Sequence, residues 1–549
     1  MAKKIIDLSG LGGLAPRYYG DRPFTGGSDR DGEVINWQHR IIGESNMYAT
    51  GVVNPMAIYG CLSPANGSFE TIDATDTTDV IGASLYDPGD KLGQDKAIWL
   101  LDRGTKLWHL SSTLDTSATE KNEIIGAEGV DLADYLIGGS RKLFYSYKSE
   151  EGGDVAIFDT DGTGFDDTWL SSTAAGGFNT AADTETRFIV ADNSFMYLTD
   201  GSYLHKIDGT SAGGTNGTAI GNILSFPSTF TIVDGVNFRG TIWLSITRNS
   251  GVGSYQNRLC GVYVWDRQST TANMSDFIPI NGTSSIKALF VFRGVVWIFT
   301  VSTDGRGQLR VFDGTNFKII KELGKNDYPN FPQSVEVVDD FIFWLARGGR
   351  IFTYGKIDSS TKDALYQIGD LFNEVPEGET WREAGAISVV GGHHSSSTGL
   401  EIYEVAYNLA FKTFDGYYLR RFYPNTHDAP VDDSSPMPHS GDFKTLLILL
   451  PKLSIIKSVT LYYPKTYTGS GATRKVMDID LYFNGSRTSW GTKTLTRDDG
   501  ARGYYYIPVD KNNVNSIQLG LTWKTDNSLE YTITPMYAEI EYEETKKMK

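Results

Sequence analysis

The chain has 549 residues and a formal net charge of −17, which argues against a surface that holds phosphate backbones with clustered Lys and Arg. Hydrophobic residues make up 40% of the chain and aromatic residues 12%, a composition typical of packed globular proteins rather than disordered ones. This length exceeds one ordinary core, so we expect two or three domains unless a repeat extends one of them.

Residues 1–45 are rich in glycine and carry no sustained apolar periodicity. We expect an extended arm here, which lies either on the propeller that the next part of the chain predicts or on a neighbouring subunit. The start, MAKKIIDLSG, lacks the apolar core of a secretory signal, and no run in the chain is long and apolar enough for a transmembrane helix. With only two cysteines, Cys61 and Cys260, we expect synthesis in a reducing cytoplasm and no part for disulfides.

A short strand recurs between residues 46 and 425, opening with polar residues and running through two apolar residues to an aromatic one. A second strand follows each copy after a turn, and it tends to end in Asp, as in VAIFDTDG and LRVFDG. The copies recur every 46 to 54 residues, and they end at Trp99, Tyr145, Tyr197, Trp243, Trp297 and Phe343.

Alternating strands that recur at this interval are typical of the blades of a β-propeller. One blade cannot bury both faces of its sheet, so blades pack around an axis and the ring closes. We therefore predict an all-β chain with a propeller of six to eight blades, seven being the favoured number, over residues 46–425. The seventh blade would combine GLEIYEV from Gly399 with AFKTFDG ending at Gly416, and NPMAIYG near the start would supply a closing strand.

An acidic stretch within the repeat, AIFDTDGTGFDDTW, raises the question of a calcium site. Asp159, Asp161, Thr163 and Asp167 follow a register that a calcium loop can use, but Leu170 stands where an EF-hand needs a bidentate Glu. Asp-Gly pairs recur at the equivalent turn of other copies, where they supply the positive φ angles of tight hairpins. We predict a turn without a metal or any other cofactor, with a calcium loop at these four residues as the weaker alternative.

Other candidate chemistry is sparse. His393 and His394 are adjacent, but neighbouring strand residues point to opposite faces, so we interpret them as part of a solvated loop rather than a metal site. The remaining histidines, such as His39, His109 and His205, are isolated in sequence. Nucleophile elbows, phosphate loops, dinucleotide fingerprints and zinc-protease motifs do not occur. We predict that the chain is not an enzyme.

Residues 440–549 show a different pattern of longer alternating strands, such as SIIKSVTLYY, VMDIDLYFNG and MYAEIEYEE. Six such strands with Gly and Asn turns and no propeller period predict a C-terminal antiparallel β-sandwich.

The order of SGLGGLAPRYY, then MYATGVVNPMAIYGCLSP, then FDG-type blades and a final TPMYAEIEYEE resembles virion proteins of tailed bacteriophages. Similar propellers occur in tail nozzle or hub proteins and in minor tail proteins. The resemblance implies a structural role in assembly and genome passage, with no catalytic residues. It also implies that the chain is made in the host cytoplasm and resides in the virion, with other tail proteins and further copies of itself as partners.

Two alternatives remain open. One is a receptor- or carbohydrate-binding tail protein, in which the sandwich or the loops of one propeller face touch a host surface glycan. The other is a glycan hydrolase on a propeller scaffold, which accounts for the fold but not for the missing motifs. In every case we expect no membrane anchor and no sequence-specific binding of nucleic acid, because like charge repels the genome.

Overall fold

Most residues that the computed structural model describes lie in β-strands, in agreement with the predicted all-β class. Among the described residues, helix is confined to η3 (Met274–Asp276), η4 (Pro332–Ser334) and α2 (Arg497–Gly500), and none of it is long and apolar enough to cross a membrane. The described residues are 2–7, 53–54, 63–64, 68–72, 80–86, 97–110, 119–137, 140–149, 152–159, 164–170, 185–192, 194–208, 218–248, 259–338, 340–355, 363–370, 381–395, 401–413, 417–422, 439–444, 448–465, 475–486, 488–526, 533, 535 and 537–544.

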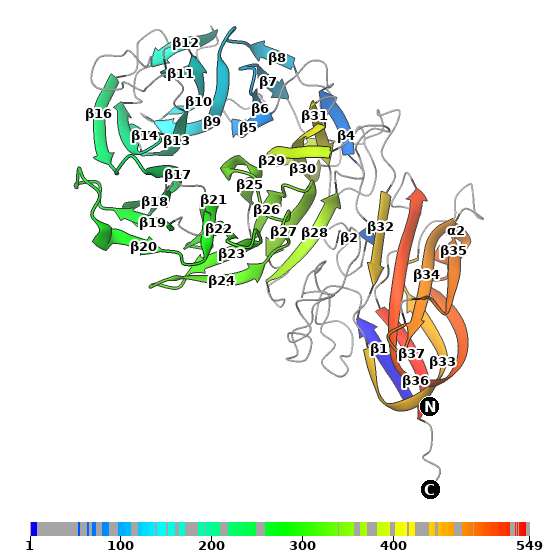
Figure 1. Cartoon of the computed structure of the whole chain (residues 1–549). Helices are drawn as coiled ribbons and strands as arrows, with labels where there is room; N and C mark the ends of the chain where they lie inside the picture. The colour runs from blue at the N-terminus through cyan, green and yellow to red at the C-terminus, as the bar shows by residue number, and fades with distance from the viewer. Residues whose placement is uncertain are drawn as a thin grey trace.

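The middle of the chain forms a β-propeller of four-stranded antiparallel sheets (Figure 1). Seven such sheets are described. The first sheet consists of β5 (Val80–Tyr86), β6 (Ala97–Asp102), β7 (Leu107–Leu110) and β8 (Thr119–Asn122), and the second of β9 (Glu128–Ile137), β10 (Ser140–Ser149), β11 (Gly152–Asp159) and β12 (Gly164–Leu170). The third consists of β13 (Thr186–Ala191), β14 (Phe195–Asp200), β15 (Tyr203–Asp208) and β16 (Thr218–Ser225). The fourth consists of β17 (Phe230–Phe238), β18 (Thr241–Arg248), β19 (Leu259–Trp265) and β20 (Phe277–Pro279). The other three are β21 (Thr283–Phe292), β22 (Val295–Ser302), β23 (Gly307–Phe312) and β24 (Phe317–Glu322); β25 (Val335–Val338), β26 (Phe341–Leu345), β27 (Arg350–Gly355) and β28 (Ala364–Asp370); β29 (Trp381–Ser395), β30 (Glu401–Thr413), β31 (Tyr417–Phe422) and β4 (Ser68–Ile72).

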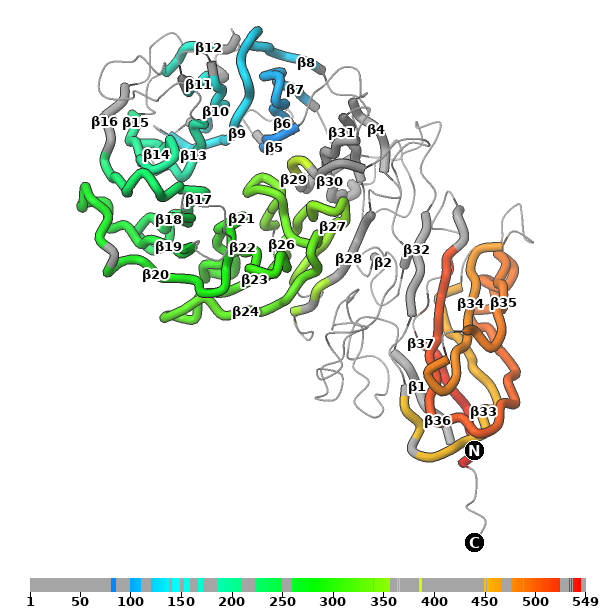
Figure 2. Tube along the Cα trace, in the orientation of Figure 1, coloured from blue at the N-terminus to red at the C-terminus, as the bar shows by residue number. Residues whose placement is uncertain are grey.

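The first strand of each sheet lies nearest the axis, and these strands follow one another around it (Figure 2). β5, β9, β13 and β17 each contact the next of these strands, as far as β21. η4 contacts β21 just before β25 begins, and β29 contacts both β25 and β5. The arrangement therefore returns to its starting point.

The last sheet corrects two sequence predictions. GLEIYEV and AFKTFDG do not form two strands, because Glu401–Thr413 is the single strand β30, paired with β29 and β31. The closing strand is β4 (Ser68–Ile72), which pairs with β31, and not NPMAIYG. Of that stretch only Asn54 is described, in the short strand β2 (Val53–Asn54) that pairs with β3 (Ser63–Pro64).

The repeated aromatic residues are all buried and all lie on the second strand of their sheets. Trp99, Tyr197, Trp243 and Trp297 each pack against the following sheet. Tyr145 packs instead against Trp99 and Leu101 of the preceding sheet, while its neighbour Phe144 packs against the following one. Phe144 is therefore the true equivalent, because a slip of one residue along a strand moves a side chain to the opposite face.

The C-terminal region is one continuous antiparallel sheet of seven strands in the described chain, in the order β1-β37-β33-β36-β34-β35 with β32 also paired to β36. Its strands alternate between solvent and one apolar core that includes Leu461, Ile479 and Ile540. The two-sheet sandwich stays a prediction. The strands are β1 (Ala2–Asp7), β32 (His439–Lys444), β33 (Ile448–Tyr462), β34 (Lys475–Phe483), β35 (Gly491–Thr496), β36 (Tyr504–Asp526) and β37 (Tyr537–Glu544).

The beginning of the predicted arm is part of this sheet. Strand β1 pairs with β37 in register from Ala2 opposite Tyr542 to Asp7 opposite Tyr537, so the two ends of the chain lie side by side (Figure 1). The rest of the 1–45 segment lies outside the described residues. The start of the arm thus lies on the C-terminal sheet and not, as we expected, on the propeller.

Candidate functional site: the axial cavity

A cavity of about 590 Å³ lies on the axis of the ring, lined by residues from the innermost strands of all seven sheets and from η4. Most of its wall is apolar, and includes Ile189, Leu289 and Ile387. Its polar lining groups are Tyr135, Asp234, Asn237, Gln333 and Glu336. Its volume falls within the range of small-molecule sites, and a few convergent polar groups in an apolar wall are typical of such sites.

Two buried aspartates next to this cavity hold neighbouring sheets together. Asp234 Oδ1 accepts a hydrogen bond from Gly235 N–H at 2.8 Å, and its Oδ2 accepts one from Leu289 N–H in the next sheet at 2.7 Å. Asp131 repeats this pattern, accepting from Leu132 N–H at 3.0 Å and from Phe188 N–H in the next sheet at 2.9 Å. Each carboxylate therefore acts as a staple between two innermost strands.

Both aspartates sit at the same irregularity of the backbone. A β-bulge separates Gly129 from Asp131 on β9 and Ile232 from Asp234 on β17, so each Asp directly follows the extra residue. A bulge bends its strand and re-aims the following side chain, which here places the carboxylate against the next strand. Each of these aspartates follows a valine in the sequence, and a pattern of two residues is too short to predict the contact with the next sheet.

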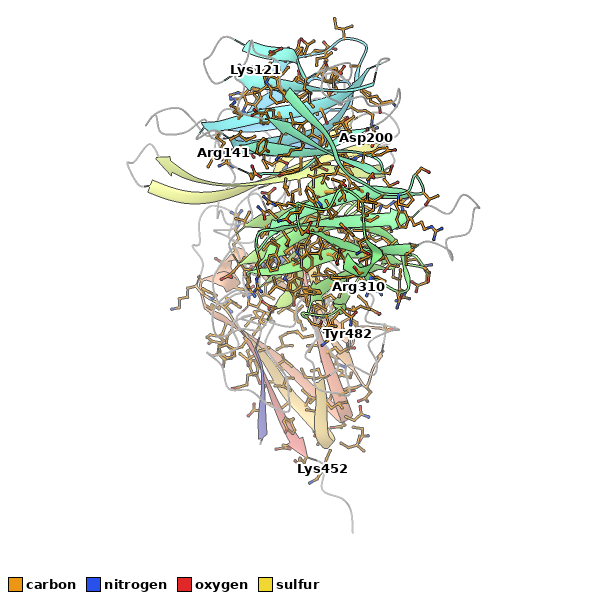
Figure 3. The ribbon with its side chains drawn as sticks, turned by 90° about the vertical axis from the view of Figure 1, so that its left-hand side faces the viewer. Lys121, Arg141, Asp200, Arg310, Lys452 and Tyr482 are labelled. Atoms are coloured by element: carbon orange, nitrogen blue, oxygen red, sulfur yellow. The ribbon has the colours of Figure 1, made fainter. Side chains whose placement is uncertain are left out.

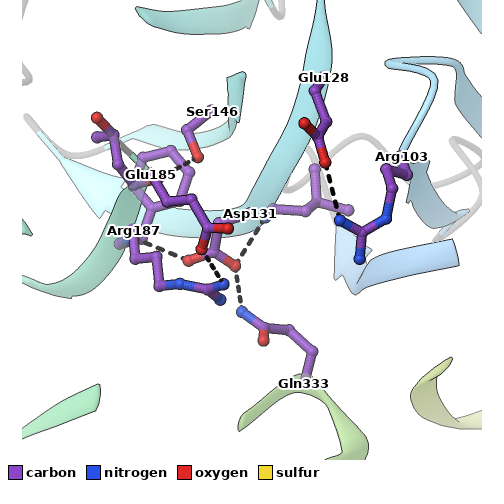
Figure 4. Close-up of polar contacts among 10 residues, drawn as sticks. Arg103, Glu128, Asp131, Ser146, Glu185, Arg187 and Gln333 are labelled. Atoms are coloured by element: carbon purple, nitrogen blue, oxygen red, sulfur yellow. Dashed lines mark hydrogen bonds and ion pairs between the residues drawn. The ribbon is translucent and has the colours of Figure 1, made fainter. Parts of the chain in front are cut away.

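Gln333 on η4 and Glu336 on β25 bring two further polar side chains to the axis. Gln333 Nε2 donates a hydrogen bond to Asp131 Oδ1, so its Oε1 points elsewhere, and that buried oxygen accepts no hydrogen bond from the described residues (Figure 4). Ser334 Oγ donates to Gly385 O at 2.8 Å, which fixes η4 against β29. Glu336 lines the cavity and keeps part of its surface accessible from it.

Burial raises the pKa of the carboxyl groups around the cavity. Burial raises the pKa of Asp131 to about 6 and that of Asp234 to about 7. Burial, together with the nearby charge of Asp134, raises the pKa of Glu336 to about 8. Desolvation, followed by the charges of Asp131, Asp134 and Asp234, also raises the pKa of Tyr135. The carboxyl groups around the axis therefore bind protons more tightly than ordinary carboxyl groups do.

Ion pairs surround one end of this polar region. Arg187 Nη2 lies 2.6 Å from Glu185 Oε2 and also turns toward Asp131, and Arg103 Nη1 lies 2.8 Å from Glu128 Oε1 (Figure 4). Further along β9, Asp134 pairs with Arg141, whose side chain is labelled in the side view of Figure 3. These cations are therefore already matched by carboxylates.

The structure gives only a partial view of the predicted calcium loop. Asp159 ends strand β11, while Asp161 and Thr163 lie outside the described residues. Asp167 lies on β12, where its Oδ1 accepts hydrogen bonds from Asn122 Nδ2 at 2.7 Å and from Tyr145 O–H at 3.1 Å. Asn122 belongs to the preceding sheet, so Asp167 joins two sheets. Within the described part of the chain, three or more acidic, His or Cys side chains do not gather as metal ligands would.

The histidines require one correction. His393 and His394 lie within the long strand β29, paired with Tyr403 and Ile402, and not in a loop. His205 is isolated in sequence but not in the fold, because its Nε2 lies 3.1 Å from Asp200 Oδ2 and both side chains are buried. The hairpin of β14 and β15 makes this pair, which sequence spacing alone does not distinguish from chance.

Comparisons with known proteins identify no family. No family profile and no curated protein sequence matches the chain. Among solved structures, an exo-β-1,3-galactanase from Phanerochaete chrysosporium is similar over 87% of this chain and 99% of its own, at 11% identity and a TM-score of 0.29. The β-propeller domain of Cps50 (Swd1) from Myceliophteria thermophila (63% and 98% covered, 7% identity, TM-score 0.37) and BamB from Moraxella catarrhalis (62% and 85%, 11%, 0.32) are similar as well. Likenesses this low carry no argument about function.

Proposed function

We propose that this protein is a structural component of a tailed-phage virion, placed in the tail as a nozzle, hub or minor tail protein and acting in assembly. The seven described sheets would form the seven blades of one closed ring. The observation that carries the proposal is the use of the buried carboxylates. Asp131 and Asp234 both bind backbone N–H groups of two neighbouring sheets, which suits a rigid ring whose outer surfaces meet partners.

Genome passage would not run through the ring itself. The axial cavity of about 590 Å³ has the size of a small-molecule site, and the innermost strands line it. A channel wide enough for DNA would instead lie between several copies arranged around a tail axis. A net charge of −17 per chain would then keep the genome from binding to the channel wall.

Immunogold labelling of purified particles of the phage that encodes the chain tests this proposal. We expect label at one fixed position on the tail, and we expect particles made without the chain to lack the density at that position. Absence of the chain from purified infectious particles, measured by mass spectrometry, contradicts the proposal. Removal of residues 1–43 should reduce incorporation while leaving the ring folded, because β1 reaches the C-terminal sheet and not the ring.

A second candidate function, binding of a host glycan or receptor, is favoured by one surface of the C-terminal sheet. Tyr537, Tyr462 and Tyr504 stand directly opposite one another on three adjacent strands, with ring centroids 4.5 Å and 6.4 Å apart. Tyr504 and Tyr506 are 51% and 54% exposed. Exposed tyrosine clusters are typical of binding surfaces. Loss of cell adsorption in a Tyr504→Ser, Tyr506→Ser variant that still incorporates into particles would favour this function.

The third alternative, a glycan hydrolase, fits the axial carboxyl groups less well. A retaining or inverting mechanism needs two carboxyl groups that face the sugar. Asp131 and Asp234 direct both oxygens at backbone N–H groups, which leaves Glu336 as the acidic side chain of the cavity wall that is free of such contacts in the described chain. We therefore do not assign catalysis to this site.

A further inference from the structure

We propose that the axial cavity binds an alkylammonium group, which docks on Glu336 with its carbon chain against the apolar wall. This inference goes beyond the structural role above and does not depend on it. It rests on the composition of the cavity wall, on a buried acceptor without a donor, and on the electrostatic state of the axis.

The described part of the cavity wall carries acidic and no basic side chains. Asp234 and Glu336 line it, and no Lys, Arg or His is among its described lining residues. The cations Arg141 and Arg187 are paired with Asp134 and Glu185. An anion in this cavity would meet only acidic groups, whereas a cation would meet a complementary carboxylate.

Gln333 Oε1 supplies the second observation. Gln333 lines the same cavity, and its Oε1 atom is buried and accepts no hydrogen bond from the described residues. A buried acceptor that lacks a donor raises the free energy of the folded state, so a ligand that brings N–H groups is favoured there. An ammonium group carries three such donors and can reach more than one acceptor at once.

The apolar wall distinguishes an alkylammonium from a metal ion. Calcium and magnesium require a shell of six or more oxygens, whereas the wall here is mainly Ile, Val, Leu, Phe and Ala. A short carbon chain gains free energy by leaving water for such a wall. A free alkylamine and a lysine side chain of a partner protein present the same chemistry, and the experiment below separates these two sources.

Binding should be coupled to proton release. Burial, with the charge of Asp134, raises the Glu336 pKa to about 8, and the other titratable groups coupled around the axis are Asp131, Asp234, Tyr135 and Arg187. Glu336 is then protonated in the empty protein at pH 7, and an ammonium group favours its ionised form. The apparent affinity should rise about tenfold per pH unit up to about pH 8 and level off above it.

Isothermal titration of the full chain with n-butylammonium at several pH values tests the proposal. n-Butanol, which has the same shape without the charge, and butyrate, which has the opposite charge, serve as control ligands. We expect butylammonium to bind at least tenfold more tightly than either, with a binding enthalpy that changes with the ionisation enthalpy of the buffer. N-acetyl-lysine-N-methylamide, compared with its norleucine analogue, reports whether a lysine side chain reaches the site as well as a free amine does.

The matched variants are Glu336→Gln, which removes the charge from the cavity, and Glu322→Gln, which removes it from the exposed outer strand β24. We expect Glu336→Gln to weaken butylammonium binding roughly tenfold or more and to abolish its pH dependence, because hydrogen bonds to charged groups contribute more than neutral ones. Glu322→Gln should bind like the parent chain. Near-ultraviolet circular dichroism checks that both variants are folded.

Four results would overturn the proposal. They are the absence of butylammonium binding by both calorimetry and NMR chemical shifts, equal binding of butanol, unchanged binding by Glu336→Gln, and displacement of the amine by an equal concentration of calcium. The last result would assign the cavity to a metal ion instead.

Discussion

Asp234 shows how one side chain can decide whether two sheets of the ring stay together. In Asp234→Ala the N–H groups of Gly235 and Leu289 lose their acceptor while remaining buried. Each such loss costs about 1 to 3 kcal/mol, so we expect the free energy of unfolding to fall by roughly 2 to 5 kcal/mol. Asp234→Asn keeps one acceptor oxygen, so its stability should lie between those of the parent chain and Asp234→Ala. Urea titration measures the free energy of unfolding. A loss in Asp234→Ala no larger than that in the exposed control Glu322→Ala would argue against the staple.

Asp167 separates the structural and calcium interpretations of the acidic stretch. Its carboxylate accepts hydrogen bonds from Asn122 and Tyr145, so Asp167→Ala should destabilise the fold by about 1 to 2 kcal/mol without any metal. The variant and the parent chain should each have the same melting temperature in millimolar calcium and in chelator. A calcium-dependent rise in the parent that disappears in the Asp161→Asn, Asp167→Ala double variant would establish the metal site instead.

At the scale of the element, each blade depends on the aromatic side chain of its second strand. Trp297 on β22 is 9% exposed and contacts Phe292 of its own sheet and Tyr354 of the next, with ring centroids 5.6 Å and 5.9 Å away. We expect Trp297→Ala to cost about 3 to 5 kcal/mol, because it leaves a cavity between two sheets. Trp490, which is 41% exposed, is the matched control. If Trp490→Ala lowers the melting temperature as much as Trp297→Ala does, the packing of Trp297 between two sheets is not what stabilises the ring.

Strand β4 is the element that completes the last sheet. A chain that begins at residue 73 lacks Ser68–Ile72 and leaves the edge of β31 unpaired next to the first sheet. We expect this truncation to lower the melting temperature of the ring and to expose it to proteolysis, because an open ring has two free edges. A chain that begins at residue 8 loses only β1 and should keep the ring unchanged. Identical protease patterns for the two truncated chains would contradict closure by β4.

For the whole molecule, the axial carboxyl groups predict how stability depends on pH. Asp131, Asp234 and Glu336 have pKa values of about 6, 7 and 8, all above those of an unfolded chain. The folded state therefore binds these protons more tightly. The resulting stabilisation is complete below about pH 4 and is lost as the pH rises toward about 8.

Glu336→Gln isolates this effect, because a glutamine mimics the protonated acid at every pH. The variant should match the parent chain near pH 4 and exceed its stability by roughly 1 to 3 kcal/mol at pH 9, where the parent carries a charge on the axis. The partial access of Glu336 to the cavity keeps this difference below what complete burial would give. Denaturant titrations at both pH values provide the measurement, and a constant difference between variant and parent would refute it.

The sequence by itself determined the local features of the fold. Strands, hairpin turns and the recurring aromatic residues follow from alternation and from Asp-Gly pairs, which act over a few residues and are therefore visible without a structure. The all-β class, the propeller and the burial of Trp99, Tyr197, Trp243, Trp297 and Phe343 were predictable for this reason. The face on which Tyr145 lies was not, because one residue of slip separates it from Phe144 and both are aromatic.

Only the tertiary structure decided which distant segments meet. Ser68–Ile72 closes the ring although NPMAIYG reads equally well as a strand, and Ala2–Asp7 joins Tyr537–Glu544 at the other end of the chain. The staples of Asp131 and Asp234 reach residues 57 and 55 positions away, and Gln333 reaches Asp131 across 202. Strand pairing and carboxylate contacts depend on which backbone groups remain unpaired after folding, and no local pattern of residues records that.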